Sequence, residues 1–254
     1  MRARRVILIA LFAAAVLLRV ADTFRPLDRA SWRESDIGSI SRNFTREGMN
    51  PLYPRIDWRG TGSGYAEMEL PLYPWTIAVV YEAFGVHDET GRIISLLLSL
   101  GVLAFFWFLA RDILEPDAAV AAFAFFAFNP LIFEISTAVQ PEGLTMLAYL
   151  GAAYFFARWM RTERLLNLFT AAAFTSLSIL AKATSAHIGL LFAILWFRKE
   201  GVAAFKNWRV YAFASIALIP GVLWYIHAKS LWLMYGNSLG VSNEYHWIGA
   251  DFFT

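Results

Sequence analysis

The stretch IISLLLSLGVLAFFWFLA, residues 93–110, contains no charged residue and lies between Arg92 and Arg111. Its length approaches the ~20 apolar residues that a helix needs to cross the hydrocarbon core of a bilayer. Similar apolar runs precede and follow it: Val6–Val20, Leu70–Val86, Ala118–Ile135, Leu144–Ala157, Leu165–Ala181, Ile188–Phe197 and Val210–His227. The pattern predicts an all-α, polytopic transmembrane helical bundle.

Composition supports this class and excludes several others. Hydrophobic residues make up 58% of the 254 residues and charged residues 17%, whereas soluble domains are about 45–50% apolar. The absence of cysteine excludes disulfides, thiolate nucleophiles and cysteine-ligated metal centres. The net charge is +2, and the basic residues form no stripe interleaved with aromatic residues. This pattern predicts no nucleic-acid partner. No nucleotide is expected, because no phosphate-binding glycine motif is present.

The N-terminal apolar run follows a basic segment, Met1–Arg5. This pattern is typical either of a cleaved signal peptide or of an uncleaved membrane anchor. The small residues of a cleavage site are missing from Arg19-Val20-Ala21, which favours the anchor. We then expect Arg19 at the far membrane face, with its side chain reaching water.

Charge asymmetry predicts the topology. If Leu70–Val86, with Pro71, Pro74 and Glu82, lies along the interface, the short loops rich in arginine and lysine all face the cytoplasm with the N-terminus. If that run crosses the membrane, the basic residues of every later loop move outside, against the positive-inside rule. We therefore expect about seven spans, with Leu70–Val86 as an amphipathic or re-entrant helix at the outer surface. The basic residues concerned are Arg2, Arg4, Arg5, Arg111, Arg158, Arg161, Arg164, Arg198, Lys199, Lys206 and Arg209.

This topology leaves a long first extracytoplasmic loop, at about residues 21–92. Its stretch Ser31–Gly48 has helical spacing of Trp32, Ile37, Ile40 and Phe44, and Asn50–Gly64 is rich in turn residues. We expect juxtamembrane helices and ordered structure here, within a single domain that covers 1–254.

Four charged residues on this side of the membrane could carry chemistry. Asp36 could act as a general base or form a salt bridge with Arg33. Glu69 could bind a metal, hold an acceptor or cap a helix, and Glu142 could be functional or complement a helix dipole. Lys182, a basic residue in a short outer loop, could hold a lipid phosphate or extend to water.

The chain resembles the bacterial integral membrane glycosyltransferases of the C-type fold, glycosyltransferase family 39, which include protein O-mannosyltransferases and lipid A aminoarabinose transferases. The resemblance runs from the N-terminus to about Arg209. It rests on the order and spacing of Trp32–Phe44, Asn50–Asp57, Glu69–Tyr73, Phe84-Gly85, Arg92–Ser95, Asn129-Pro130, Gln140–Glu142 and Leu180–Lys182.

The resemblance implies an enzyme of the bacterial cytoplasmic (inner) membrane with its active site on the extracytoplasmic side. Its donor would be a polyprenyl-phosphate sugar, held within membrane lipid, and transfer to a lipid, glycan or protein acceptor would invert the anomeric centre. Asp36 matches the family's catalytic acid, although its usual Asp-Glu pair is here Glu34-Ser35-Asp36, so Glu34 is a second candidate. Lys182 matches the lysine that contacts phosphate. The remaining residues implied in substrate binding are Arg42, Arg55, Glu69 and Glu142.

Other readings stay open. A carboxylate pair could hold a divalent cation. Family members are roughly twice as long, so the chain is expected to be an N-terminal fragment. A non-catalytic membrane scaffold remains an alternative. A transporter-like protein is another, although the charged residues lie at the ends of the apolar runs and not within them.

Overall fold

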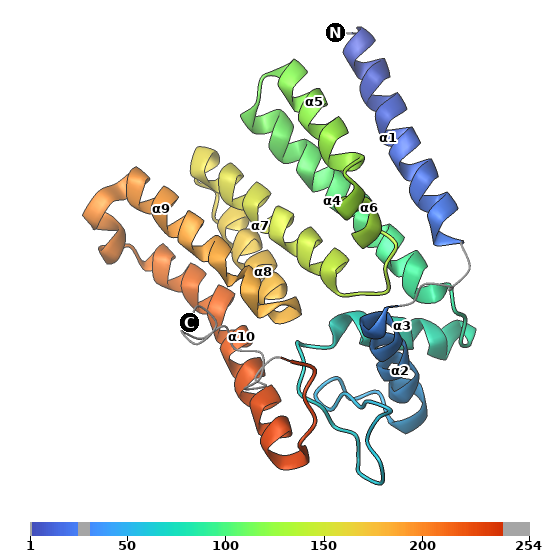
Figure 1. Cartoon of the computed structure of the whole chain (residues 1–254). Coiled ribbons are helices and arrows are strands. Elements are labelled where there is room, and N and C mark those ends of the chain that lie inside the picture. The colour runs from blue at the N-terminus through green and yellow to red at the C-terminus, as the bar shows by residue number, and fades with distance from the viewer. Residues whose placement is uncertain (1, 25–30, 241–254) are drawn as a thin grey trace, which may run out of the picture.

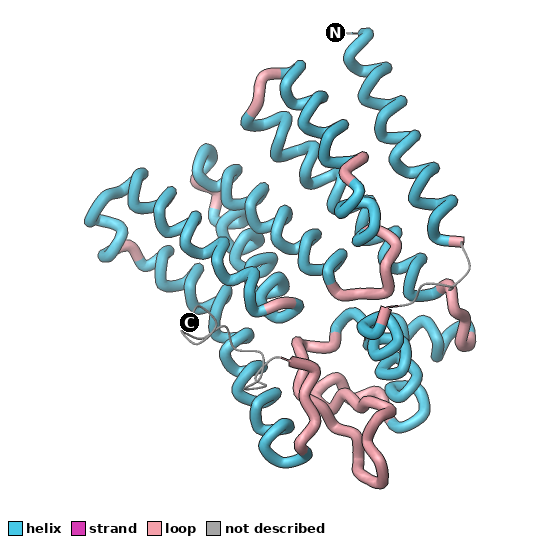
Figure 2. The backbone as a smooth tube through the Cα atoms, in the orientation of Figure 1, coloured by secondary structure: helices cyan, strands magenta, loops and turns pink. Residues whose placement is uncertain are grey.

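The computed structural model describes residues 2–24 and 31–240, and these form a helical bundle without regular strands (Figures 1 and 2). The fold is therefore all-α, as predicted. The helices are α1 (Arg2–Thr23), α2 (Trp32–Glu47), α3 (Leu72–Phe84), α4 (Thr90–Ile113), α5 (Pro116–Ala127), α6 (Pro130–Ile135), α7 (Glu142–Thr162), α8 (Leu165–Ala181), α9 (Ile188–Glu200) and α10 (Trp208–Tyr235), with short 3-10 turns at Ala183–His187 and Gly201–Lys206.

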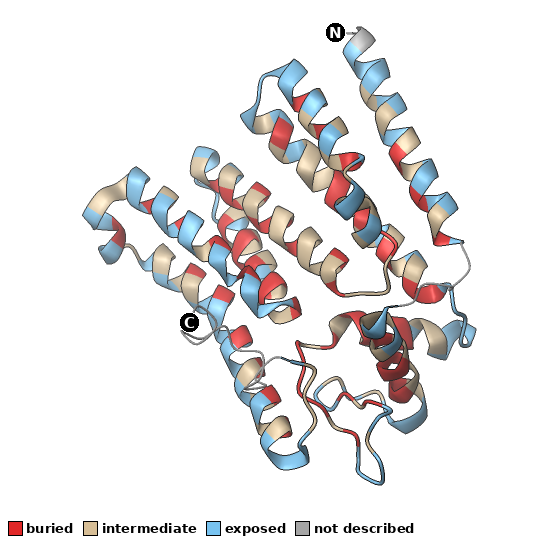
Figure 3. Cartoon of the chain, viewed as in Figure 1, coloured by how far each residue is buried: buried red, intermediate tan, exposed pale blue. Residues whose placement is uncertain are grey.

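Three helices are long and apolar enough to cross a membrane by themselves: α1, α4 and α10. Many of their residues are exposed (Figure 3). The exposed residues include large aliphatic ones such as Ile9, Leu97 and Leu223, as expected of surfaces that face lipid. The interior is packed with aromatic rings between α7, α9 and α10; Phe156, Phe192 and Phe213 are all buried there. The count of seven spans stays a prediction, because α5, α8 and α9 are shorter.

The bundle has two chemically different ends. The N-terminus and the α4–α5, α7–α8 and α9–α10 connections lie together at one end, which we call the basic end (Figure 1). Helices α2 and α3, the α6–α7 turn and the α8–α9 turn lie at the opposite end, which we call the cavity end. All predicted cytoplasmic loops therefore share one end, and all predicted outer loops share the other.

Helix α2 forms where the spacing predicts it. Ser31 caps its first turn, and Ile37, Ile40 and Phe44 are buried against α3. Trp32 departs from the expected apolar face, because its side chain is 77% exposed.

Helix α3 crosses the cavity end and does not run alongside the spanning helices (Figure 1). The Tyr73 hydroxyl donates to the Gly91 carbonyl at 2.8 Å and contacts Ser95 Oγ at 2.6 Å. These bonds fix the start of α3 against α4. The predicted surface helix over Leu70–Val86 is thus a helix in the expected place, four residues shorter than the apolar run.

The predicted span Ala118–Ile135 was wrong as a single helix. It breaks at Phe128, after which Asn129 caps α6 by accepting from Leu131 N at 3.0 Å. Pro130 then occupies the first position of α6. Proline removes a backbone donor and clashes with the preceding turn of a continuous helix, so a new helix starts here.

The expectation that Arg19 reaches water was also wrong. Its side chain is fully buried between α1 and the break in the α5–α6 pair. The guanidinium donates to the Ala127 carbonyl and to Ser136 Oγ, both at 2.9 Å, and to the Ala15 carbonyl at 3.1 Å. The helix break exposes carbonyl groups in the bundle, and Arg19 satisfies one of them.

The last described segment returns to the chain that precedes α3. Helix α10 continues past His227, the end of the apolar run, to Tyr235, so Lys229 lies within the helix. The chain then pairs with the loop: Glu67 N donates to the Asn237 carbonyl at 2.9 Å, and Leu239 N donates to the Glu67 carbonyl at 2.8 Å. Residues 65–69 and 237–240 thus form one wall of the cavity end.

Arg19→Met should lower the stability of the bundle by about 2–4 kcal/mol, because it leaves buried oxygens without their charged donor. Thermal unfolding of the purified protein in detergent measures this as a lower Tm. Arg164→Met, at an exposed arginine, is the matched control and should change the Tm little. Equal Tm values for the two variants would contradict a structural role for Arg19.

Candidate functional site

Four charged side chains from separate segments line a cavity of about 320 Å³ at the cavity end. Arg33 comes from α2, Glu69 from the chain before α3, Glu142 from the first turn of α7, and Lys182 from the end of α8. The structure therefore brings together three of the predicted site residues. Leu239 and Gly240 close one side of the cavity.

The charges are paired within the cavity. Arg33 forms an ion pair with Glu69, and its Nε lies 4.0 Å from Glu142 Oε1. The same Glu142 oxygen accepts from Lys182 Nζ at 2.9 Å. The four groups make a chain of alternating sign, with a formal charge of zero.

Two buried atoms of these four charged side chains have no hydrogen-bond partner within the part of the protein that the structure describes: Arg33 Nε, a donor, and Glu142 Oε2, an acceptor. Buried polar groups are nearly always paired. A donor and an acceptor left open beside a cavity can instead bind a polar ligand. Lys182 remains half-exposed and can also reach an anion there.

Glu69 is the most deeply buried carboxylate of the group. Burial raises its pKa, and the positive charge of Arg33 opposes that rise. Arg33 therefore stabilises the ionised form of an acid that is otherwise removed from water.

Glu34 has a structural contact for each oxygen. One oxygen accepts from Ser31 N at 2.9 Å and completes a capping box with the Ser31 side chain. The other accepts from Val139 N at 2.9 Å and so ties α2 to the α6–α7 turn. The signal in the sequence was the Ser31-x-x-Glu34 spacing, which is typical of a helix start.

Asp36 lies one turn after Arg33 on α2, where residues three apart are neighbours. It makes no ion pair with Arg33 within 4 Å among the described residues, contrary to the alternative considered from spacing. Burial raises the pKa of Asp36, while hydrogen bonds from the Trp58 and Trp32 side chains lower it. Its carboxylate is thus half-buried beside two indoles.

Arg42 and Arg55 lie outside the cavity. Arg42 faces Asp57 at 3.9 Å and lines a separate hollow between α2 and α3. Arg55 donates to the Glu47 carbonyl at 2.6 Å and to Tyr65 Oη at 2.7 Å. Both arginines therefore make contacts within residues 42–65, away from the cavity.

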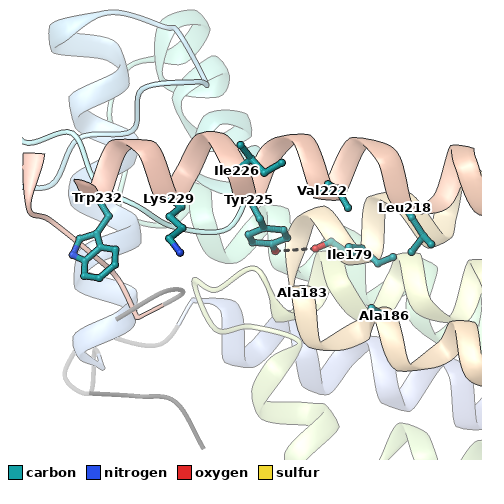
Figure 4. Close-up of a pocket in the computed structure, with 10 residues that line it drawn as sticks. Ile179, Ala183, Ala186, Leu218, Val222, Tyr225, Ile226, Lys229 and Trp232 are labelled. Carbon is teal, nitrogen blue, oxygen red and sulfur yellow. Dashed lines mark hydrogen bonds between the residues drawn. The ribbon is translucent and has the colours of Figure 1, made fainter. Parts of the chain in front are cut away.

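An apolar groove adjoins the cavity between α8 and α10 (Figure 4). It has a volume of about 690 Å³, and Tyr225 and Ala183 line both spaces. The Tyr225 hydroxyl donates to the Ile179 carbonyl at 2.9 Å. Lys229 projects from α10 at the Trp232 end of the groove (Figure 4). An apolar chain with a charged head would find matching surfaces here.

The side chains that line the cavity do not fit a binding site for a divalent cation. Within 2–24 and 31–240, no three acidic or histidine side chains come together. Glu69 and Glu142 are close to one another, yet each is already paired with a cation. We therefore derive no catalytic step through a metal.

Sequence reasoning missed Arg33, Tyr225 and Lys229 as cavity or groove residues. Arg33 was considered only as a partner of Asp36. The 225–229–232 stripe of Tyr, Lys and Trp follows helical spacing, and this signal could have identified the groove face of α10.

Comparison with known proteins identifies one family. A family model described as dolichyl-phosphate-mannose-protein mannosyltransferase matches residues 69–225. The matched segment contains Glu69, Glu142, Lys182 and Tyr225, whereas α2 precedes it. No curated protein matches the chain.

Glu34→Ala should destabilise the protein by about 1–2 kcal/mol, because it removes the Glu34 half of the capping box and leaves Ser31 N and Val139 N without their acceptor. Glu34→Gln should lose less, since glutamine also completes a capping box. Denaturation monitored by tryptophan fluorescence gives the free energies, and Glu82→Ala, at an exposed position of α3, is the control. A Glu34→Ala variant as stable as this control would argue against the cap.

Proposed function

Because the chain belongs to the dolichyl-phosphate-mannose-protein mannosyltransferase family of membrane glycosyltransferases, we propose that it transfers a sugar from a polyprenyl-phosphate donor. The single observation that carries this proposal is the junction of a charged cavity with an apolar groove. Such a donor has a phosphate between a polar sugar and an apolar chain. The charged cavity, which would hold the sugar and the phosphate, meets the apolar groove, which would hold the chain, at Tyr225 and Ala183.

The phosphate would lie beside Lys182 and Arg33. Both cations now contact carboxylates, so the donor would replace Glu142 on Lys182. Charge-assisted bonds of this kind are stronger than neutral ones, and they would hold the charge that builds on the departing phosphate. Glu142 and Glu69 would then accept from sugar hydroxyls.

The polyprenyl chain would occupy the groove between α8 and α10. Its walls include Leu218, Val222 and Ile226, and Lys229 stands at one end. Burial of apolar surface contributes about 25 cal/mol per Å². A chain of several isoprene units thus gains affinity that a free sugar phosphate lacks.

Asp36 would be the general base. Its carboxylate lies one turn from Arg33, and neither a cap nor a salt bridge within the described residues occupies it. Glu34, the second candidate, uses both oxygens to hold backbone amides. We therefore assign Glu34 a positioning role, and Asp36 the proton transfer.

The reaction would be a single displacement. The acceptor hydroxyl oxygen forms a bond to the anomeric carbon while the bond from that carbon to the phosphate oxygen breaks. The phosphate leaves with the electron pair, and the hydroxyl proton passes to Asp36. Attack from the face opposite the leaving group inverts the anomeric centre.

By the positive-inside rule, the basic end would lie in the cytoplasm and the cavity would open on the outer side of a bacterial inner membrane. The acceptor would be a lipid, glycan or protein exposed on that side. Arg42 and Arg55 would support the first outer loop and would contact substrate less directly than Lys182.

Lys182→Gln should raise the KM for the polyprenyl-phosphate sugar about tenfold or more and lower kcat, because a cation is lost from the leaving phosphate. Transfer of radiolabelled sugar in membranes measures both constants. Lys199→Gln is the matched control, since Lys199 also pairs with a glutamate, Glu163 at 2.7 Å, but at the basic end. Equal effects of the two variants would contradict the phosphate site.

Asp36→Asn should lower kcat about 10²- to 10⁴-fold, as expected for loss of a general base. Glu34→Gln and Asp57→Asn, two other acids of the same loop, should each change kcat by less than tenfold. Because burial raises the pKa of Asp36, the acidic limb of the wild-type pH profile should lie above the usual aspartate range. Full activity of Asp36→Asn would exclude Asp36 as the base.

A further inference from the structure

We propose that the basic end carries a binding site for an anionic phospholipid, between α1, α4 and α5. A cavity of about 260 Å³ opens there. Arg4 and Arg5 of α1 and Arg111 of α4 line it together with an apolar wall. This cavity is at the end of the bundle opposite the proposed donor site.

The arginines that line this cavity are not all paired with carboxylates. Arg4 contacts Asp117 through two nitrogens, at 2.5 and 2.6 Å. Asp112 accepts from both Arg111, at 3.2 Å, and Arg161, at 2.9 Å. Arg5 forms no ion pair within the described residues.

Only one further acid, Glu115, lies in the α4–α5 connection. Arg4 and Arg111 therefore already have carboxylate partners, whereas Arg5, the third arginine that lines the cavity, is exposed and available. A phosphate group can contact Arg5 and the outer edges of its neighbours without breaking an existing pair.

The rest of the cavity suits an acyl chain. Leu8, Trp107 and Val120 form its apolar wall. Helix α1 packs on α4 and α5, and its other faces expose Val6, Ile7 and Ile9. The cavity between α1, α4 and α5 thus adjoins exposed apolar faces of α1 that would contact lipid.

These features favour a lipid over a soluble anion. Inorganic phosphate would gain from the arginines alone, whereas a phospholipid also buries apolar surface against Leu8 and Val120. Basic pockets between membrane helices on the cytoplasmic side are a known way to hold anionic headgroups. A zwitterionic lipid would bring its own positive charge toward Arg5 and bind less well.

The test is thermal unfolding of the purified chain in a neutral detergent, with added phosphatidylglycerol, phosphatidylcholine or inorganic phosphate. Phosphatidylglycerol should raise the Tm by about 5 °C or more, because a ligand of the folded state stabilises it. Phosphatidylcholine and inorganic phosphate should each have little effect. The proposal fails if either one matches phosphatidylglycerol.

Variants locate the site. Arg5→Gln, and Arg5→Gln with Arg111→Gln, should each weaken the apparent affinity for phosphatidylglycerol, by about fivefold per arginine. Arg164→Gln removes an exposed arginine outside the cavity at the same end and should keep the wild-type response. Lys182→Gln should also keep it, which separates this site from the donor site. A response lost in Lys182→Gln but retained in Arg5→Gln would overturn the proposal.

Discussion

The cavity end of the bundle depends on the balance of charges among the four ionised side chains that line its cavity. Arg33, Glu69, Glu142 and Lys182 come from parts of the chain far apart in sequence, and each partly buried charge needs the others. Removing a charge from water is costly unless an opposite charge compensates. The network therefore holds α2, the chain before α3, α7 and α8 in one arrangement. In the proposed function, a donor phosphate would replace Glu142 on Lys182 and would keep that cation paired.

Much of the fold could be predicted because lipid imposes simple rules on sequence. Apolar length predicts helices, and the arginines and lysines of the short loops predicted which connections share an end. The distribution of these basic residues also predicted that Leu70–Val86 does not span the membrane. In the structure, α3 lies across the cavity end (Figure 1). These properties depend on composition over many residues, so a single sequence reveals them.

The remainder depends on individual contacts that composition does not reveal. A buried arginine and an arginine that reaches water look alike in sequence. The contact of Arg19 with the Ala127 carbonyl exists because α5 ends there, before Asn129 and Pro130 start α6. Sequence alone likewise treated Glu34 and Asp36 as two acids of one helix. They differ because of tertiary contacts. The amide of Val139 donates to Glu34, whereas the side chains of Trp58 and Trp32 donate to Asp36.

The pairing of residues 65–69 with residues 237–240 has a consequence for synthesis of the protein. About 170 residues separate Glu67 from Ser238, whose backbones pair beside the cavity. Contacts of such long sequence separation form late, because the intervening chain must first be ordered. Residues 65–69 must therefore wait for this pairing until the chain from α3 to α10 has been made. The side of the cavity that Leu239 and Gly240 close is thus completed only after α10 has been made, so a chain that has not yet reached these residues has an open cavity.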